Sequence, residues 1–365
     1  MHEQKLYQDD FLDIKLDGRR EQDALRRLRL PEGKIDFCSN DYLGVVTNGL
    51  IGANDLPHGS TGSRLLSGNN PLIEETEKAI ADFHQAEAAL LFNSGYDANL
   101  GVLSCVPQRG DTILYDQLSH ASIRDGIRLS FAQSFSFHHN DVGDLERRLR
   151  EVKSRVFVVT ESVFSMDGDV APLERMLRLC GEYGAHLILD EAHATGVIGE
   201  KGEGLAQEVG VQGECFIRIH TFGKAVGCHG AVVLGSERLR QFLVNFCRPL
   251  IYSTALPPVS IGAVADAYRL FPRMQAERER LSQLIDRFRR AAIGYERFDS
   301  PTPIQVVIVP GNTAVRDLAA QLQEAGLDIP PILYPTVPKG SERLRIVIHS
   351  FNTEAEIDKL TALLR

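Results

Sequence analysis

The feature that most constrains the fold is a series of short apolar runs separated by helix-like or Gly-containing stretches. The runs are "DTILY" (111–115), "SRVFVVTES" (154–162), "AHLILD" (185–190), "CFIRIHT" (215–221) and "GAVVLG" (230–235). They follow "PLIEETEKAIADFHQ", which has the apolar spacing of a helix, and "EAALLF", which predicts a short buried strand. Nearly continuous Val, Ile and Leu strands that alternate with helices are typical of a parallel or mixed sheet covered on both faces. The sequence therefore predicts an α/β fold.

The two ends of the chain predict further units beside this sheet. After "RPLIYSTALPP" (248–258), a helical stretch rich in Arg, Glu and Leu extends to about residue 293. "IQVVIVP", "AVRDLAAQLQEAG" and "RLRIVIHS" then give the strand, helix and strand of a small α/β domain. Residues 1–30 carry Leu12, Leu16, Leu25 and Leu28 at helix-like spacing, which predicts an amphipathic arm. We therefore expect an N-terminal arm (1–44), a large domain (45–255) and a smaller C-terminal domain (256–365).

The composition disfavours several classes of function. The formal net charge is −9 and no long Lys/Arg run occurs, so nucleic acid is not an expected partner. The six cysteines include no C-x-x-C pair, which favours reduced thiols over disulfides or a metal site. The N-terminus lacks an apolar signal segment, and no apolar stretch approaches the length of a membrane span. We therefore expect a cytoplasmic protein without a membrane span or a bound metal.

Polar residues that could carry chemistry follow the apolar runs. In open α/β sheets ligands bind at the carboxyl ends of the strands, where Asp190, His193 and Lys224 are expected. Each has an ordinary alternative: the aspartate could cap the next segment, the histidine could be a structural hydrogen-bonding group, and the lysine could lie at a surface turn. Together, a buried amine and a strand-end carboxylate indicate a cofactor with an aldehyde and a pyridine nitrogen, pyridoxal phosphate (PLP).

This cofactor gives each candidate residue a task. Asp190 would keep the pyridine nitrogen protonated, and Lys224 would bind the aldehyde covalently and later act as general acid and base. "NSGYDANLG" offers Ser94, Gly95 and Tyr96 at a turn into a helix, where backbone N–H groups bind phosphate, and Thr221 could add a hydroxyl. G-x-x-x-x-G-K-[ST], G-x-G-x-x-G after the first strand and H-E-x-x-H do not occur, which removes three rival chemistries. "HGSTGSR" (58–64) remains open as a turn near the site or a direct contact.

An ordered series of motifs along the chain resembles a known family. It comprises "FCSNDYLG", "GSTGSRLLSGN", "DQLSHASIRDG", "TESVFSMDGDVAPL", "DEAHATGVIGEKGEG", "HTFGKAVG", "IYSTALPP" and "RLRIVI". The series is similar to that of the α-oxoamine synthases, a branch of the fold-type-I PLP enzymes. The resemblance implies a large domain with a mostly parallel seven-stranded sheet flanked by helices, plus a smaller C-terminal α/β domain.

The resemblance also implies roles for individual residues. It assigns PLP contacts to Lys224, Asp190 and His120, which stacks on the ring, to Ser165 and His193 at the phenolic oxygen, and to Ser94, Gly95, Tyr96 and Thr221 at the phosphate. Ser253 and Thr254 match a segment that reaches the phosphate of the neighbouring subunit, which implies a homodimer. Asn40 and Arg345 resemble binders of the amino-acid carboxylate, for which a guanidinium fork is suited. Arg26 aligns with an active-site arginine of the N-terminal arm.

Within the family, four segments favour one reaction. "SNDYLG", "GSTGSRLLSGN", "DQLSHAS" and "IYSTALPP" are most similar to members that condense L-alanine with a pimeloyl thioester in biotin biosynthesis, releasing CO2 and free thiol. The acyl carrier is either coenzyme A or an acyl carrier protein. Alternatives are another member, such as glycine C-acetyltransferase or serine palmitoyltransferase, a transaminase on the same fold, or a regulatory protein that binds PLP without turnover.

Overall fold

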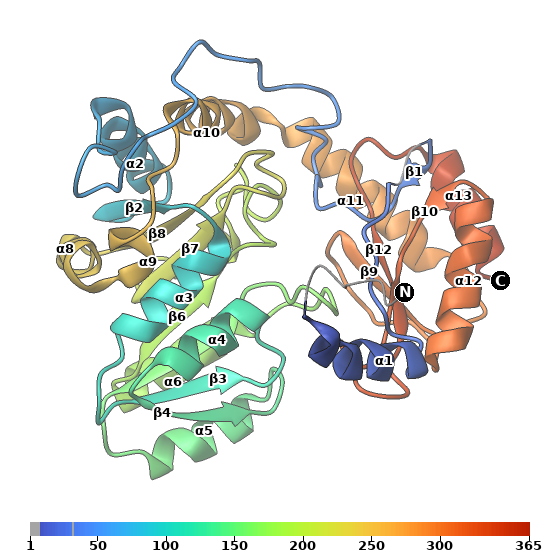
Figure 1. The fold of residues 1–365 in the computed structure, drawn as a ribbon, viewed down its shortest axis with the longest axis horizontal. Helices are drawn as coiled ribbons and strands as arrows, with labels where there is room; N and C mark the ends of the chain where they lie inside the picture. Colours follow the sequence, from blue (N-terminus) through green and yellow to red (C-terminus); the bar gives the residue numbers. More distant parts are fainter. Residues whose placement is uncertain (1–7, 31–32) are drawn as a thin grey trace, which may run out of the picture.

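A computed structural model describes residues 8–30 and 33–365 and is built around a seven-stranded sheet (Figure 1). The strands lie in the order β2-β8-β7-β6-β5-β3-β4. All pairings that involve β8 are antiparallel and the other pairings are parallel. The predicted mostly parallel sheet is therefore confirmed. Its strands are β2 (Ala88–Phe92), β3 (Thr112–Asp116), β4 (Gln133–Phe137), β5 (Val156–Glu161), β6 (His186–Asp190), β7 (Ile217–Thr221) and β8 (Ala231–Gly235).

Helices cover both faces of this sheet because alternate strand residues point to opposite sides. In β5, Val156 and Val158 pack in one core cluster, whereas Phe157 and Val159 pack in the other. The second cluster includes residues of α3 (Gly95–Cys105), α4 (Ala121–Leu129), α8 (Glu237–Phe246) and α9 (Arg248–Ile251). The first includes residues of α2 (Pro71–Phe83), α5 (Val142–Glu151), α6 (Leu173–Tyr183), α7 (Leu205–Glu208) and α10 (Pro258–Leu270).

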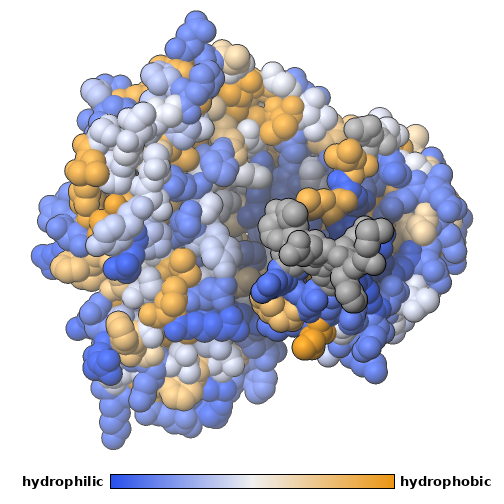
Figure 2. Space-filling view, viewed as in Figure 1, coloured by the Kyte–Doolittle hydropathy of each residue, from blue (hydrophilic) through white to orange (hydrophobic). Residues whose placement is uncertain are grey.

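The C-terminal part contains the predicted strand, helix and strand (Figure 1). Antiparallel β11 (Pro331–Ile332), β12 (Arg343–Val347) and β9 (Ile304–Ile308) lie beside α12 (Asn312–Glu324) and α13 (Glu354–Leu363). The long helical stretch consists of α10 and α11 (Gln275–Arg290), with a 3₁₀ turn at Phe271–Arg273 between them. Pro272 lies in that turn, and proline cannot continue a regular helix. Figure 2 shows a hollow lined largely by hydrophilic residues between this part and the sheet.

The N-terminal arm is helical over a shorter stretch than its spacing predicts. The described part contains a 3₁₀ turn at Asp10–Leu12 and α1 (Asp13–Glu21), so the helical prediction for Leu25 and Leu28 is wrong. Asp23, with φ 50°, ends the helical path before these residues, and hydrogen bonds to the C-terminal part fix the chain there instead. The arm continues to β1 (Ile35–Asp36), which pairs with β10 (Leu327–Asp328). Residues 1–7 of the predicted arm lie outside the described residues, and the division into three units stays a prediction.

Along the described ranges, no helix combines the length and apolar character needed to cross a bilayer. All six cysteines are free thiols, two of them buried and the others partly buried.

Two adjacent buried histidines lie in the core, His84 at the end of α2 and His220 in β7. The rings of His84 and His220 are 4.0 Å apart between centroids. His84 bonds to Gln207 and Tyr268, and its backbone oxygen accepts from the buried Arg218 guanidinium. Burial and the charge of Arg218 lower the pKa of His84 to about 3, and burial lowers the pKa of His220 well below its usual value. Both imidazoles are therefore neutral in the folded protein at neutral pH.

We expect the contribution of His84 and His220 to the free energy of unfolding to fall as the pH drops below about 6.5. There the unfolded chain binds protons at His84 and His220 that the folded chain excludes, so each contributes a slope of about 1.4 kcal/mol per pH unit until its folded pKa is reached. Urea titrations at pH 7, 6 and 5 measure this loss. His84→Gln should reduce the slope, whereas His58→Gln at an exposed position should not. Equal slopes in wild type and His84→Gln would contradict the assignment.

Candidate active site

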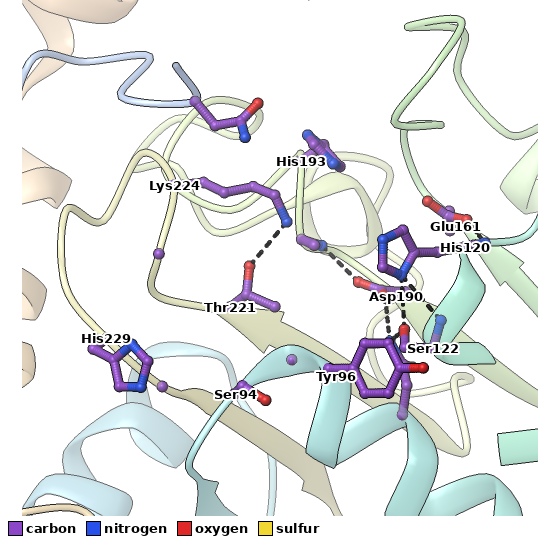
Figure 3. Close-up of a pocket in the computed structure, with 16 residues that line it drawn as sticks. Ser94, Tyr96, His120, Ser122, Glu161, Asp190, His193, Thr221, Lys224 and His229 are labelled. Atoms are coloured by element: carbon purple, nitrogen blue, oxygen red, sulfur yellow. Dashed lines mark hydrogen bonds between the residues drawn. The ribbon is translucent and has the colours of Figure 1, made fainter. Parts of the chain in front are cut away.

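A polar pocket lies where several strands of the large sheet end. Asp190 ends β6, Thr221 ends β7 and Glu161 ends β5, while Ser94 and Gly95 begin α3 just after β2. Lys224 follows β7 in the Gly-rich turn before β8. Figure 3 shows these side chains around one cavity, with Lys224 extended toward its centre. The topology therefore brings the amine, the carboxylate and a helix N-terminus together.

Lys224 lies in this pocket without an ion-pair partner among the residues that the structure describes. Its Nζ donates to Thr221 Oγ1 at 3.4 Å, a long and weak contact. Burial lowers the pKa of Lys224, although the nearby Asp190 carboxylate acts in the opposite direction. A larger fraction of the side chain is thus the neutral amine, the form that is nucleophilic and basic.

The carboxylate of Asp190 is held by two neutral donors. Asn99 Nδ2 donates to Oδ2 at 2.7 Å, and the Ala192 N–H donates to Oδ1 at 2.9 Å. The same Asn99 amide also donates to Ser122 Oγ at 3.1 Å. Sequence reasoning missed Asn99, although it stands four residues after Gly95 and therefore on the same helix face. The carboxylate is oriented by these bonds without being neutralised.

Glu161 is a second buried carboxyl of the pocket that sequence reasoning did not identify. Its Oε1 accepts the His120 backbone N–H at 2.6 Å, and the residue is 3 % exposed. Burial and the nearby Asp190 charge raise the pKa of Glu161 well above its usual value. The environment of Glu161 therefore favours its neutral, protonated form. Its position as the last residue of the apolar run "RVFVVTE" could have identified Glu161, because strand ends are where site residues are expected.

His120 begins α4 and forms a wall of the pocket. Its Nδ1 lies 2.8 Å from Ser122 Oγ, and the side chain caps the helix by accepting the Ser122 N–H at 3.3 Å. The ring is thereby fixed at the pocket, where its face can support a planar group (Figure 3).

The N-terminus of α3 closely approaches the end of β7. Ser94 caps this helix, and its Oγ accepts the Asp97 N–H at 3.0 Å. A Cβ at Gly95 would come within 2.4 Å of Thr221 Cγ2, so only glycine fits there. The free N–H groups of a first helical turn beside a threonine hydroxyl suit an anion. The Tyr96 hydroxyl instead bonds to Asp125.

Some predicted site residues lie outside the pocket. Asn40 lines it together with His193, and Arg345 lies directly behind, donating to Asn40 Oδ1 at 3.0 Å and to the Ser165 backbone oxygen at 2.6 Å. The Ser165 side chain does not line the pocket. Arg26 donates to Thr336 Oγ1 at 2.9 Å in the C-terminal part. The structure thus gathers the carboxylate candidates Asn40 and Arg345 but not Arg26.

Ser253 and Thr254 line a separate, small cavity in this chain. That cavity also includes Asn93, whose amide donates to the Thr254 backbone oxygen at 2.9 Å, and Arg64, which pairs with the buried Glu77 at 2.6 Å. Arg64 belongs to "HGSTGSR", and no residue of that segment lines the pocket around Lys224. The predicted contact of Ser253 and Thr254 with a second subunit stays a prediction.

The motif order, the fold and this pocket agree with comparisons to known proteins. Residues 32–364 match the model of the aminotransferase class I and II family, to which the chain therefore belongs. Its relatives place it in the α-oxoamine synthase branch that the motifs predict.

Relatives by sequence and by structure belong to two named kinds of α-oxoamine synthase. The 8-amino-7-oxononanoate synthase of Emericella nidulans is 40 % identical, over 94 % of this chain and 92 % of that protein. A serine palmitoyltransferase from S. paucimobilis, solved with PLP and myriocin bound, has a TM-score of 0.85 at 28 % identity, over 97 % of this chain and 96 % of that one. The 8-amino-7-oxononanoate synthase from Francisella tularensis has a TM-score of 0.75 at 28 % identity, over 91 % and 97 %.

Proposed function

We propose that this chain condenses L-alanine with a pimeloyl thioester to give 8-amino-7-oxononanoate, CO2 and free thiol, as a PLP-dependent acyltransferase of biotin biosynthesis. The observation that carries the proposal is one pocket that holds both the Lys224 amine, whose hydrogen bond to Thr221 is long and weak, and the Asp190 carboxylate. The choice of reaction rests on relatives named 8-amino-7-oxononanoate synthase at 40–42 % identity over most of the chain.

The pocket has the donor set that PLP requires. The amine of Lys224 suits the aldehyde, Asp190 suits the pyridine nitrogen, and the glycine-restricted cradle of Gly95 and Thr221 suits the phosphate. Bound PLP supplies a protonated pyridine ring, which accepts the electron pair released when a bond to the substrate α-carbon breaks. His120 is placed to support one face of that ring.

The side chains of the pocket hold the ring proton, transfer the substrate proton and orient the substrate. Asp190, held by Asn99, keeps a proton at the ring nitrogen placed against it. Lys224 Nζ removes and returns the proton at the substrate α-carbon, for which a lowered pKa is suited. Arg345, with Asn40, orients the amino-acid carboxylate through charge-assisted hydrogen bonds. The roles of Ser165, His193, Ser253, Thr254 and Arg26 are proposed on the family resemblance.

Serine palmitoyltransferase activity is the second candidate, because the backbone superposes better on that enzyme than on the Francisella synthase. We favour 8-amino-7-oxononanoate synthesis because substrate choice depends on side chains. Two sequence relatives named 8-amino-7-oxononanoate synthase are 40 % and 42 % identical to this chain, whereas the serine palmitoyltransferase and the Francisella synthase are both 28 % identical. Fold similarity alone does not distinguish reactions in one family.

We propose further that the protein works as a cytoplasmic homodimer with coenzyme A or an acyl carrier protein as the acyl carrier. Large apolar side chains are exposed on the segments around Ser253 and Thr254, with Tyr252 71 % exposed and Phe246 58 % exposed. Leu66, 84 % exposed, follows the nearby Gly-rich turn. Clustered apolar exposure of this kind favours burial against a second copy.

The first test is an absorbance titration of the PLP-loaded protein with L-alanine, glycine and L-serine, followed by addition of pimeloyl-CoA while free thiol is measured. We expect L-alanine to perturb the cofactor absorbance at the lowest concentration and thiol to be released in step with product. Preference for serine with palmitoyl-CoA would move the assignment to the second candidate. Pyridoxamine phosphate formed with alanine would indicate a transaminase, and no thiol release from any donor would indicate a regulatory protein.

A further inference from the structure

A continuous hydrogen-bond chain runs from Arg345 to His193 behind the pocket. Arg345 Nη2 donates to Asn40 Oδ1 at 3.0 Å, and the Tyr42 hydroxyl donates to the same oxygen at 3.1 Å. The Tyr42 oxygen lies 2.6 Å from His193 Nδ1. Tyr42 is fully buried and His193 is 6 % exposed. Residues from three distant segments are thus joined in one relay.

The direction of each hydrogen bond in this relay follows from what the groups can donate. A guanidinium has only donors, so Arg345 requires the Asn40 oxygen, not its NH2 group, to face it. Asn40 Oδ1 can only accept, so the 3.1 Å bond from the Tyr42 hydroxyl uses the single proton of that hydroxyl. In this arrangement the Tyr42 oxygen is left as an acceptor, and His193 Nδ1 carries the proton between them.

His193 carries a proton on only one of its two ring nitrogens at neutral pH, because its imidazole is neutral. Burial lowers the pKa of His193 well below its usual value, and the cations Lys224 and Arg345 add to the effect, so the imidazole is neutral. With the proton on Nδ1, Nε2 is bare. Within the described ranges Nε2 has no hydrogen-bond partner, and His193 lines the pocket beside Lys224 (Figure 3).

We propose that Arg345, Asn40 and Tyr42 act as a relay that fixes His193 as the Nδ1–H tautomer, with Tyr42 as a positioning residue. In the cofactor-free protein, His193 therefore presents a hydrogen-bond acceptor to the pocket. The relay also joins the predicted carboxylate binders to the predicted neighbour of the phenolic oxygen, a consequence that rests on the proposed function. If Arg345 or Asn40 changes its hydrogen-bond partner, the tautomer of His193, and so the group it presents to the pocket, changes as well.

The test is a long-range ¹H–¹⁵N spectrum of the full-length chain labelled with [¹⁵N]histidine and freed of cofactor. The two nitrogens of a neutral imidazole resonate at separate frequencies according to which one carries the proton, so the tautomer is read directly. The His193 signals are identified by their loss in His193→Gln. We expect Nδ1–H in the wild type, and an Nε2–H tautomer there would overturn the proposal.

Asn40→Ala separates the relay from a purely structural role of Tyr42. This variant leaves Tyr42 and His193 intact but removes the acceptor for the Tyr42 proton, which can then turn to Nδ1. We expect the ratio of Nδ1–H to Nε2–H to fall by about tenfold, as for loss of one buried hydrogen bond. Tyr42→Phe should lower the ratio too, because Nδ1–H loses its acceptor.

The control is Tyr183→Phe, which removes a hydroxyl that only accepts from the exposed Arg150. It should leave the His193 signals unchanged, and unchanged signals from the other histidines report that each variant is folded. A wild-type tautomer ratio in folded Asn40→Ala would overturn the relay. The spectrum requires neither cofactor nor substrate, so this result stands apart from the outcome for the proposed acyl transfer.

Discussion

The Lys224→Ala protein is expected to fold and to lose kcat by on the order of 10⁴-fold or more, because one side chain supplies both the cofactor attachment and the proton transfer. Among the described residues, the Lys224 side chain forms one hydrogen bond, the 3.4 Å contact with Thr221, so little stability depends on it. Thiol release with L-alanine and pimeloyl-CoA measures the loss. Thermal unfolding, compared with wild type, reports whether the fold is retained.

Lys153→Ala provides the matched control, because Lys153 is exposed and lies in the connection between α5 and β5, at the opposite end of β5 from the pocket residue Glu161. It should retain wild-type kcat. Added methylamine should restore part of the activity of Lys224→Ala, since a small amine can occupy the space left by the side chain. Activity of Lys224→Ala within tenfold of wild type would remove Lys224 from the proposed mechanism.

Local sequence patterns are sufficient to locate the centre of the pocket. The runs that become β6 and β7 are short, rich in Ile and Leu and buried almost throughout, as expected for internal strands of a covered sheet. Asp190 and Thr221 are the last residues of those strands and Lys224 follows closely, so sheet topology alone brings them to one edge. The same reasoning would have included Glu161, which ends β5 in the same way.

Contacts between distant segments could not be derived from those patterns. Asn99 reaches Asp190 across 91 residues of sequence, and Tyr42 reaches His193 across 151. Such pairs depend on how α3 and the segment before α2 pack on the sheet, and no local periodicity records this packing. In the N-terminal arm, by contrast, a local pattern was present but predicted a helix that does not form. Leu25 and Leu28 continue a helical spacing, but hydrogen bonds to α12 hold the chain there in another path.

Asp190→Asn is expected to retain PLP and to lower kcat by on the order of 10³-fold or more. The substitution preserves shape but removes the negative charge that keeps a proton on the ring nitrogen. One of the two donors, Asn99 or the Ala192 N–H, then faces an NH2 group, which costs about 1–3 kcal/mol of stability. Bound PLP, thermal unfolding and thiol release must therefore be measured on the same preparation.

Glu161→Gln gives this prediction its sharpest control, because it makes the same chemical change in the neighbouring carboxyl. Burial and the Asp190 charge raise the pKa of Glu161 and favour its neutral form, in which an amide removes no charge and can still accept the His120 N–H. We expect Glu161→Gln to keep kcat within about tenfold of wild type, since one neutral hydrogen bond is at stake. Equal losses in the two variants would mean that general disruption of the pocket, and not the charge of Asp190, limits turnover. Near-normal turnover of Asp190→Asn would exclude the carboxylate from the chemistry altogether.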